Sequence, residues 1–410
     1  MFGISRIGRD EGGNVLAMAG VALPLMIGFV GLATDTIQWT LDKRELQRIA
    51  DSAALAGAYA IAQDLDPVAS AERSIDANNY LEFTSDPEIN NAPADGAYEG
   101  DDNAITVNLV TRRRLPFSGI FMDVAPQISA RATASMLVNG NYCVISLDTG
   151  TDVGIVSSGT PTVNLDCGMF ANSRAANAVD VNGSSELNTT LVGAVGGLTP
   201  NSLYGDAVLI PFAVAQPDPF EDLPTPNVSG CGAKLSVNPG QTKNFSPGCY
   251  KGIDIKGTAN FSPGTYFVDG SSVSFGSQAI VNGAGVTFVL TSATASSNPS
   301  SIATLSINGG ATLNLSSPTS GTYSGVLFFQ DRRAPKTGTV KINGNSSSVL
   351  EGAIYFPSKE IEFTGTSGMT TDCVQLVGFR VKFSGTTTIT NECPLNGADA
   401  FRGAVIRLVE

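Results

Sequence analysis

The sequence predicts a mainly β protein with a long N-terminal transmembrane helix, a small α/β connector and a parallel β-helix or β-solenoid C-terminal domain. Three observations predict this class: an uncharged apolar run over residues 15–33, a segment with good helix formers directly after it, and short strands separated by Asn-Gly or Ser-Gly in the second half. The domains expected are a cytoplasmic lead-in (1–14), a membrane helix that continues as a helix beyond the membrane (15–62), the connector (63–140), the β-solenoid (141–397) and a C-terminal cap or tail (398–410).

The apolar run is long enough to cross a bilayer. Its nineteen residues rise about 28 Å as a helix, at roughly 1.5 Å per residue, against a hydrocarbon core of about 30 Å. Residues 35–62 contain no proline and no glycine before Gly57, so one helix is expected to continue beyond the membrane surface. A signal peptide cleaved near Ala33 is the alternative, and the length of the run favours the uncleaved anchor.

Small residues recur on one face of the helix beyond the membrane. Ala50, Ala54 and Ala58 are spaced by four, with Gly57 beside them. Such spacing lets a second helix or a sheet approach the backbone closely, although alanine also recurs because it favours helices. The sequence leaves open whether the partner is the chain's own connector or another protein. The predicted helix-packing seam consists of Leu46, Ile49, Ala50, Ala53, Ala54, Gly57, Ala58 and Ile61.

The connector is expected to combine one helix with paired strands. Residues 68–81 have helical character, while residues 104–111 and 127–138 alternate apolar and polar side chains as strands do. Between these strands, Arg112, Arg113 and Arg114 form the densest positive cluster in the chain. A solvated strand end is the first interpretation, and a contact with lipid head groups or an acidic partner is the second.

The second half repeats a short sequence pattern, in which a stretch of alternating apolar and polar residues ends at Asn-Gly. Glycine after asparagine supplies the positive φ of a sharp turn, and repeated short strands with such turns are typical of a β-solenoid. A β-sandwich is the alternative, because its hairpins also use Asn-Gly turns. Residues 198–226 interrupt the pattern with six prolines, which predicts a surface excursion that is either a partner-binding loop or a linker. The tail over residues 398–410 has helical spacing and is expected to cap the solenoid.

All the cysteines follow the apolar run, and no two are close enough for a CxxC motif. An even number behind a membrane helix predicts disulfides in an oxidising compartment, with buried thiols as the alternative. Nearest-neighbour pairing is the simplest arrangement, and other pairings stay open. The three pairs are Cys143 with Cys167, Cys231 with Cys249, and Cys373 with Cys393.

The composition argues against several kinds of function. The chain has no histidine, which removes the commonest general base and transition-metal ligand, and its net charge of −13 disfavours nucleic acid as a partner. We therefore expect no catalytic residues, no cofactor and no metal. A β-helix enzyme acting on polysaccharides is one alternative, but the acids of the solenoid are scattered, and Asp331-Arg332-Arg333 is interpreted as a solvated loop.

Residues 13–60 carry a specific pattern: Gly13-Asn14 before the span, Pro24 within it, Asp35 after it, and a run from Leu46-Gln47 into ADSAALAGA at residues 50–58. This pattern resembles the N-terminal segment of TadG-like (TadE/TadG-like) proteins of the Tad (tight adherence, or Flp) pilus-assembly systems. The resemblance implies a single-pass protein of a Gram-negative inner membrane that serves assembly or anchoring of an adhesive pilus.

The resemblance further implies that most of the chain lies in the periplasm. The cysteines and the character of the C-terminal domain predict a cytoplasmic N-terminus. The implied partners are inner-membrane lipid and other Tad/Flp machinery, with the cell wall and a second copy of the chain as further candidates. A surface or secreted β-helix adhesin that binds glycan or a host protein is the alternative function.

Two features depart from the relatives. Pseudopilins carry a glutamate about five residues after a cleavage glycine, but Asn14 to Met18 follow Gly13 here, so cleavage of that kind is not expected. Many relatives also carry a D-x-S-x-S metal motif, whereas residues 148–152 read Asp-Thr-Gly-Thr-Asp and are interpreted as a turn.

Overall fold

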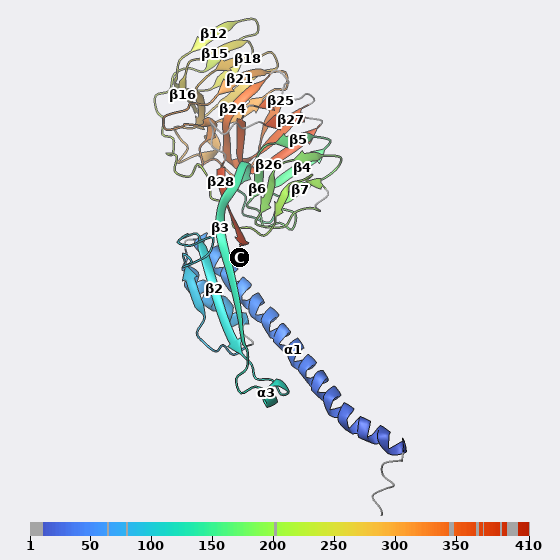
Figure 1. The fold of residues 1–410 in the computed structure, drawn as a ribbon. Helices are drawn as coiled ribbons and strands as arrows, with labels where there is room; N and C mark the ends of the chain where they lie inside the picture. The colour runs from blue at the N-terminus through green and yellow to red at the C-terminus, as the bar shows by residue number, and fades with distance from the viewer. Residues whose placement is uncertain are drawn as a thin grey trace, which may run out of the picture. The chain divides into compact units, whose positions relative to one another are not determined.

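The computed structural model describes residues 11–63, 65–78, 81–200, 203–343, 348–365, 369–371, 373–385, 388–391 and 401–409. The chain divides into two compact units. Unit 1 comprises Met1–Leu137 and Ile406–Glu410, and unit 2 comprises Val138–Val405. The predicted class, mainly β with a long apolar N-terminal helix, is confirmed (Figure 1).

Unit 1 packs helices against an antiparallel sheet. The sheet pairs β1 with β2 from Glu88 opposite Asn108, and β2 with β3 from Ala104 opposite Ser135. The predicted helix and the first predicted strand of the connector are present with small shifts at their ends, whereas the second strand, predicted over residues 127–138, continues to Ser146. The elements are α1 (Glu11–Ile61), α2 (Pro67–Asn78), β1 (Glu88–Asn91), β2 (Ala104–Arg112), α3 (Ser118–Phe121) and β3 (Gln127–Ser146).

The start of α2 is fixed by its sequence. The Asp66 carboxylate accepts hydrogen bonds from the amides of Val68 and Ala69, at 3.0 and 3.1 Å. Pro67 occupies the first helical position, where its missing N–H costs nothing. Ala71 and Ile75 of α2 are buried against α1 and the sheet.

Unit 2 is a β-solenoid-like domain with three walls of parallel strands. In Figure 1, β12, β15, β18 and β21 follow one another along one of these walls.

The first wall contains β11 (Leu235–Val237), β14 (Ile253–Ile255), β17 (Ser272–Phe275), β20 (Thr304–Ile307), β23 (Thr339–Asn343), the second halves of β24 (Val349–Gly365) and β26 (Cys373–Gly385), β4 (Ile155–Gly159) and β7 (Val179–Val181).

The second wall contains β12 (Thr242–Phe245), β15 (Thr258–Phe261), β18 (Ile280–Gly283), β21 (Thr312–Ser316) and the start of β24, and a separate sheet joins β25 (Met369–Thr371), β27 (Thr388–Asn391), β5 (Thr162–Leu165) and β8 (Glu186–Asn188).

The third wall contains β13 (Gly248–Tyr250), β16 (Gly264–Asp269), β19 (Val286–Thr291), β22 (Val326–Gln330), the middle of β24, the start of β26, the end of β3, β6 (Gly168–Ala171), β9 (Leu191–Ala194) and β10 (Val208–Ile210). A 3₁₀ helix (Pro299–Ser301) and β28 (Phe401–Leu408) complete the elements.

Alternating side chains fill the interior between the walls. Phe261, Phe288 and Phe328 lie in successive turns, with the rings of Phe288 and Phe328 stacked 5.4 Å apart. On the second wall, the Asn260 amide donates to Asn244, that of Asn282 to Asn260, and that of Asn314 to Asn282, at 2.9 to 3.0 Å. Parallel, in-register pairing explains both stacks and is incompatible with the alternative β-sandwich.

The order of turns in space differs from their order in the sequence. β3 pairs with β26 through Val144 opposite Leu376, so the chain starts the solenoid beside its last turns. It then winds outward through β4 and β7 to β10, which pairs with β9. The chain resumes at β11, which pairs with β14 at the opposite end, and winds back toward β26. Residues 211–234, here called the strap, therefore span the length of the solenoid.

Two local predictions were wrong. Gly183 has the positive φ expected after asparagine, 74°, but Asn282 and Gly283 lie inside β18, where the asparagine serves the ladder instead of a turn. The C-terminal tail is also not a helix, because β28 is a strand and the Val409 amide donates to the Thr133 carbonyl at 2.9 Å. Hydrogen bonding to the edge of β3 outweighs the helical spacing, and residues 406–410 group with unit 1 instead of the solenoid.

Candidate functional site

The predicted packing seam of α1 lies against the chain's own connector. Seven of its members are buried, and Ile61 is half-buried. Their neighbours in the core of unit 1 come from α2, β2 and β3, and include Ala71, Ile105 and Ala132. The small residues therefore serve close packing of α1 on a sheet and a second helix, one of the two partners that the sequence left open.

Gly57 is the tightest point of this seam. A Cβ at this position would lie 2.5 Å from Ile105 Cδ1 and 3.2 Å from the Pro67 carbonyl oxygen. Real Cβ atoms do not approach other heavy atoms this closely, so only glycine fits without movement of β2 or of the start of α2. Close approach of the backbone is thus the structural reason for Gly57.

The buried face of α1 continues beyond the predicted seam toward the apolar run of residues 15–33, and this continuation was not predicted from the sequence. Gly31, Asp35 and Asp42 are buried in line with Leu46. The Asp42 carboxylate lies 3.2 Å from the Arg113 guanidinium, and the Trp39 indole donates to the Arg113 carbonyl at 3.2 Å. Spacings of three, four and seven residues place these groups on one side of the helix. The available sequence signal for this extended face was Asp35, an aspartate close to the end of the apolar run.

The strap is held against the solenoid at successive points, so it is neither a free loop nor a simple linker. Asn172 and Gln216 exchange two hydrogen bonds of 2.8 Å. The Tyr355 hydroxyl donates to the Asp218 carboxylate at 2.6 Å, and the Phe220 ring packs edge-on against Tyr355. Burial, followed by the nearby Asp218, raises the pKa of Tyr355, which keeps this donor protonated.

Asp331 and the arginines after it hold the far part of the strap. Arg332 donates to the Leu223 carbonyl at 2.9 Å, and Arg333 donates to the Pro226 carbonyl at 2.7 Å. Asp331 is fully buried and accepts from Arg333 and from the Thr291 hydroxyl. Burial acts to raise the pKa of Asp331, but the hydrogen bonds from Arg333 and Thr291 outweigh it and hold the pKa below its usual value. The interpretation as a solvated loop was wrong, because sequence adjacency does not reveal a partner a hundred residues away.

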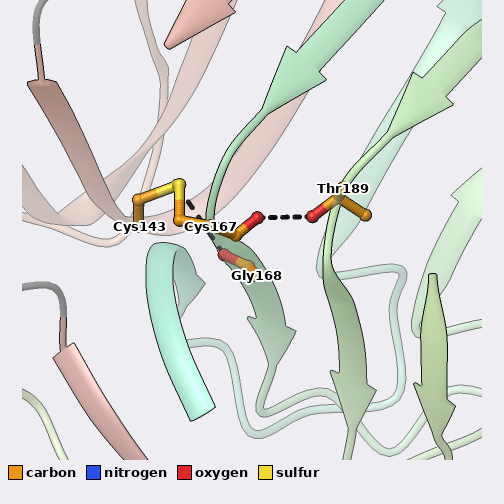
Figure 2. The surroundings of a disulfide bond; sticks show 4 residues. All are labelled: Cys143, Cys167, Gly168 and Thr189. Atoms are coloured by element: carbon orange, nitrogen blue, oxygen red, sulfur yellow. Dashed lines mark hydrogen bonds between the residues drawn. A yellow bond between two sulfur atoms is a disulfide. The ribbon is translucent and has the colours of Figure 1, made fainter. Parts of the chain in front are cut away.

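One disulfide lies where the chain enters the solenoid, and another lies where the strap ends. Cys143 and Cys167 join β3 to the residue before β6 in the next turn, and Figure 2 shows Cys167 also accepting a hydrogen bond from Thr189 at its carbonyl oxygen. Cys231 and Cys249 join the end of the strap to β13. These are two of the three nearest-neighbour pairs. Cys373 is also disulfide-bonded, and its predicted partner Cys393 lies outside the described residues.

Residues 148–152 form a turn whose two aspartates both bind Arg380. Asp148 accepts the Gly150 amide at 2.8 Å, and its other oxygen lies 2.6 Å from Arg380. Asp152 binds the same guanidinium at 2.6 Å. Arg380 thus pairs with both carboxylates, and within the described residues no group of three or more metal-binding side chains occurs. Lys336, Glu360, Phe379 and Arg380 line a shallow depression of about 340 Å³ beside this turn.

Comparison with known proteins gives one match. The Tad family model, described as Flp pilus-assembly TadE/G-like, matches residues 13–62. Residues 13–62 of this chain are thus a TadE/G-like domain. The match coincides with α1, including both its apolar half and its buried seam. Neither the curated proteins nor the solved structures gave a match.

The TadE/G-like domain supports general conclusions about function. TadE/G-like proteins are components of Tad pilus assembly, the family is generally non-catalytic, and membership implies association with other Tad machinery. The match ends at residue 62, so it says nothing about the solenoid.

Proposed function

We propose that this protein is a non-enzymatic, inner-membrane-anchored component of a Tad/Flp pilus-assembly system. In this proposal α1 holds the chain in the membrane as a single pass, with the N-terminus in the cytoplasm and the solenoid in the periplasm. The solenoid then makes the contacts with pilus machinery or the cell wall that assembly or anchoring requires.

The observation that carries the proposal is the division of α1 within the matched residues. The half within the apolar run exposes large hydrophobic side chains, among them Val21, Phe29 and Val30 at 67%, 72% and 67%. The other half buries one face in the core of unit 1. Exposed apolar residues along a single helix long enough to span a bilayer support an anchor.

The disulfides support an extracytoplasmic position of unit 2. Disulfides persist in the periplasm and are reduced in the cytoplasm. The proposed orientation rests on them, because a single pass that leaves unit 2 in the periplasm leaves the N-terminus in the cytoplasm.

The seam restricts where partners bind. Because the residues of the seam are buried in unit 1, the proposed contacts with Tad machinery are made by other surfaces, such as the solenoid walls or the lipid-facing side of α1. Exposed polar side chains on the wall strands, among them Thr242, Lys243 and Asn244 of β12, suit contacts with proteins or the cell wall.

Deletion of the gene tests the role. We expect the deletion strain to lose assembled or retained pili, counted by electron microscopy, and a plasmid copy to restore them. Normal pili in the deletion strain would exclude the proposed role.

Labelling of a cysteine at Ser320, an exposed residue of unit 2, tests the orientation. A membrane-impermeant maleimide is expected to label Ser320→Cys in intact spheroplasts, with the protein in the membrane fraction. Labelling only after lysis would reverse the orientation. A mature chain that begins after residue 33 and reaches the medium would favour the secreted adhesin.

A further inference from the structure

The connection between β2 and β3 exposes an unusual apolar tip. Ile120 is 73% exposed, Phe121 84% and Val124 64%. Three large apolar side chains in five residues of a connection that could be polar need a partner, because water does not stabilise such a cluster. Phe117 and Met122, at 38% and 40% exposed, extend the same surface.

This tip is attached to α1 and not free. The Ser118 amide donates to the buried Asp35 carboxylate at 2.6 Å. The Phe117 ring lies directly against Gly31, leaving no room there for a Cβ. The Arg114 guanidinium donates to the Gly119 carbonyl at 2.8 Å and closes the turn. In Figure 1, α3 lies beside α1 at the end of the unit 1 sheet.

The contact with Gly31 fixes the depth of the tip. Gly31 lies within the apolar run of residues 15–33, about 3 Å inside its end at 1.5 Å per residue. If this run spans the bilayer, Phe117 lies at the edge of the hydrocarbon, and the more exposed Ile120 and Phe121 lie next to the same environment. This step rests on the proposed membrane anchoring.

Polar groups around the tip fit the lipid head-group region. The side chains of Arg112 and Arg114 are exposed just before the tip, and Asp123 is exposed within it. Arginines at this height can bind lipid phosphates, while an exposed aspartate disfavours deep insertion. The charge pattern therefore suits a shallow position at the interface.

We propose that residues 116–124 form a membrane wedge that inserts into the leaflet through which α1 leaves the bilayer. Lipid is the occupant that the surface favours, because the wedge is continuous with the lipid-facing side of α1, where Phe29 and Leu32 are 72% and 53% exposed. The wedge and α1 then hold unit 1 to the membrane at two points, which restrains rotation of the unit about the helix.

Depth-dependent quenching tests the wedge in the full-length chain. An environment-sensitive fluorophore is attached to Ile120→Cys, and to Ser320→Cys as the control in unit 2. Both proteins are reconstituted into vesicles of phosphatidylcholine and phosphatidylglycerol, with nitroxide groups either near the top of the acyl chains or in water. Flotation of the vesicles reports anchoring separately. Phe121→Asp in the Ile120→Cys background removes the apolar tip without touching a buried residue.

We expect blue-shifted emission at position 120 that lipid nitroxides quench at least twofold more than aqueous ones, and reversed selectivity at position 320. Phe121→Asp should abolish the lipid quenching while the protein still floats. A floating protein whose position 120 is quenched only from water overturns the wedge and leaves the anchor intact. Blue-shifted emission that lipid nitroxides do not quench and that grows with protein-to-lipid ratio also overturns it, in favour of a second copy. Failure to float contradicts the anchor itself.

Discussion

The close approach at Gly57 gives a quantitative prediction. A Cβ in Gly57→Ala would lie 2.5 Å from Ile105 Cδ1 and 3.1 Å from its Cγ2. Overpacking of this kind costs about 1–3 kcal/mol, and alanine returns about 1 kcal/mol of helix propensity. The free energy of unfolding of unit 1 should therefore fall by about 0–2 kcal/mol relative to the unaltered protein, and by about 1–3 kcal/mol relative to a glycine-to-alanine change in α1 that has the propensity gain without the clash.

Ile105→Val identifies the clash. Valine lacks the Cδ1 atom, so the single variant Ile105→Val should lower the free energy of unfolding by about 0.5–1.5 kcal/mol. The missing Cδ1 atom leaves room for the Cβ of Gly57→Ala. The double variant should therefore be more stable than the sum of the single effects by about 1 kcal/mol, a coupling of the size that contacting residues show.

Urea unfolding in detergent, followed by the fluorescence of Trp39, measures these changes. Trp39 is the only tryptophan, its indole donates to the Arg113 carbonyl, and its side chain packs on the core of unit 1. Gly28→Ala is the matched control, because nothing lies within 4 Å of a Cβ there. Additive effects, or a Gly57→Ala protein as stable as the control, would refute the tight packing of α1 on β2.

Three further predictions concern unit 2. Arg333→Ala leaves the buried Asp331 without its main partner and should destabilise unit 2 by about 3–5 kcal/mol; unchanged thermal unfolding relative to exposed Arg174→Ala would contradict the strap network. Cys231→Ser with Cys249→Ser frees the end of the strap, should cost about 2–4 kcal/mol, and should speed cleavage of residues 211–234 by protease; equal cleavage rates would argue against this fastening. Burial raises the pKa of Tyr142 to about 12 and, with a smaller effect of Tyr250, that of Tyr266 to about 12. Their stabilisation is complete below the unfolded pKa of about 10 and is lost as the pH rises toward 12, so phenolate absorbance of the folded protein should still be rising well above pH 10; ionisation of all tyrosines together near pH 10 in the folded protein would contradict their burial.

The broad architecture was predictable because it follows from local patterns. An uncharged run long enough for a bilayer, small residues spaced by four, and strands separated by Asn-Gly each reflect constraints within a few neighbouring residues. Gly57 and Ala58 could be identified for this reason, although their partner could not be, because β2 lies more than forty residues further along the chain.

The features that the sequence did not indicate depend on distant pairing. Val144 lies opposite Leu376, and no local signal reveals that the chain starts the solenoid beside its last turns. The strap follows from this arrangement, since the chain must then travel from one end of the solenoid to the other. Its prolines indicated only that it is not a ladder strand, and Asp331 looked solvated because its environment comes from Thr291 and the strap.

Complementation by a released form tests the central claim, that this TadE/TadG-like protein acts as a membrane-anchored assembly component. A signal-peptidase site placed after Ala33 would deliver both units to the periplasm without the span, and pili would be counted in the deletion strain beside one carrying the unaltered gene. We predict that the unaltered gene restores pili and that the released form, present at equal amount and with its disulfides formed, does not. Full restoration by the released form would contradict the account.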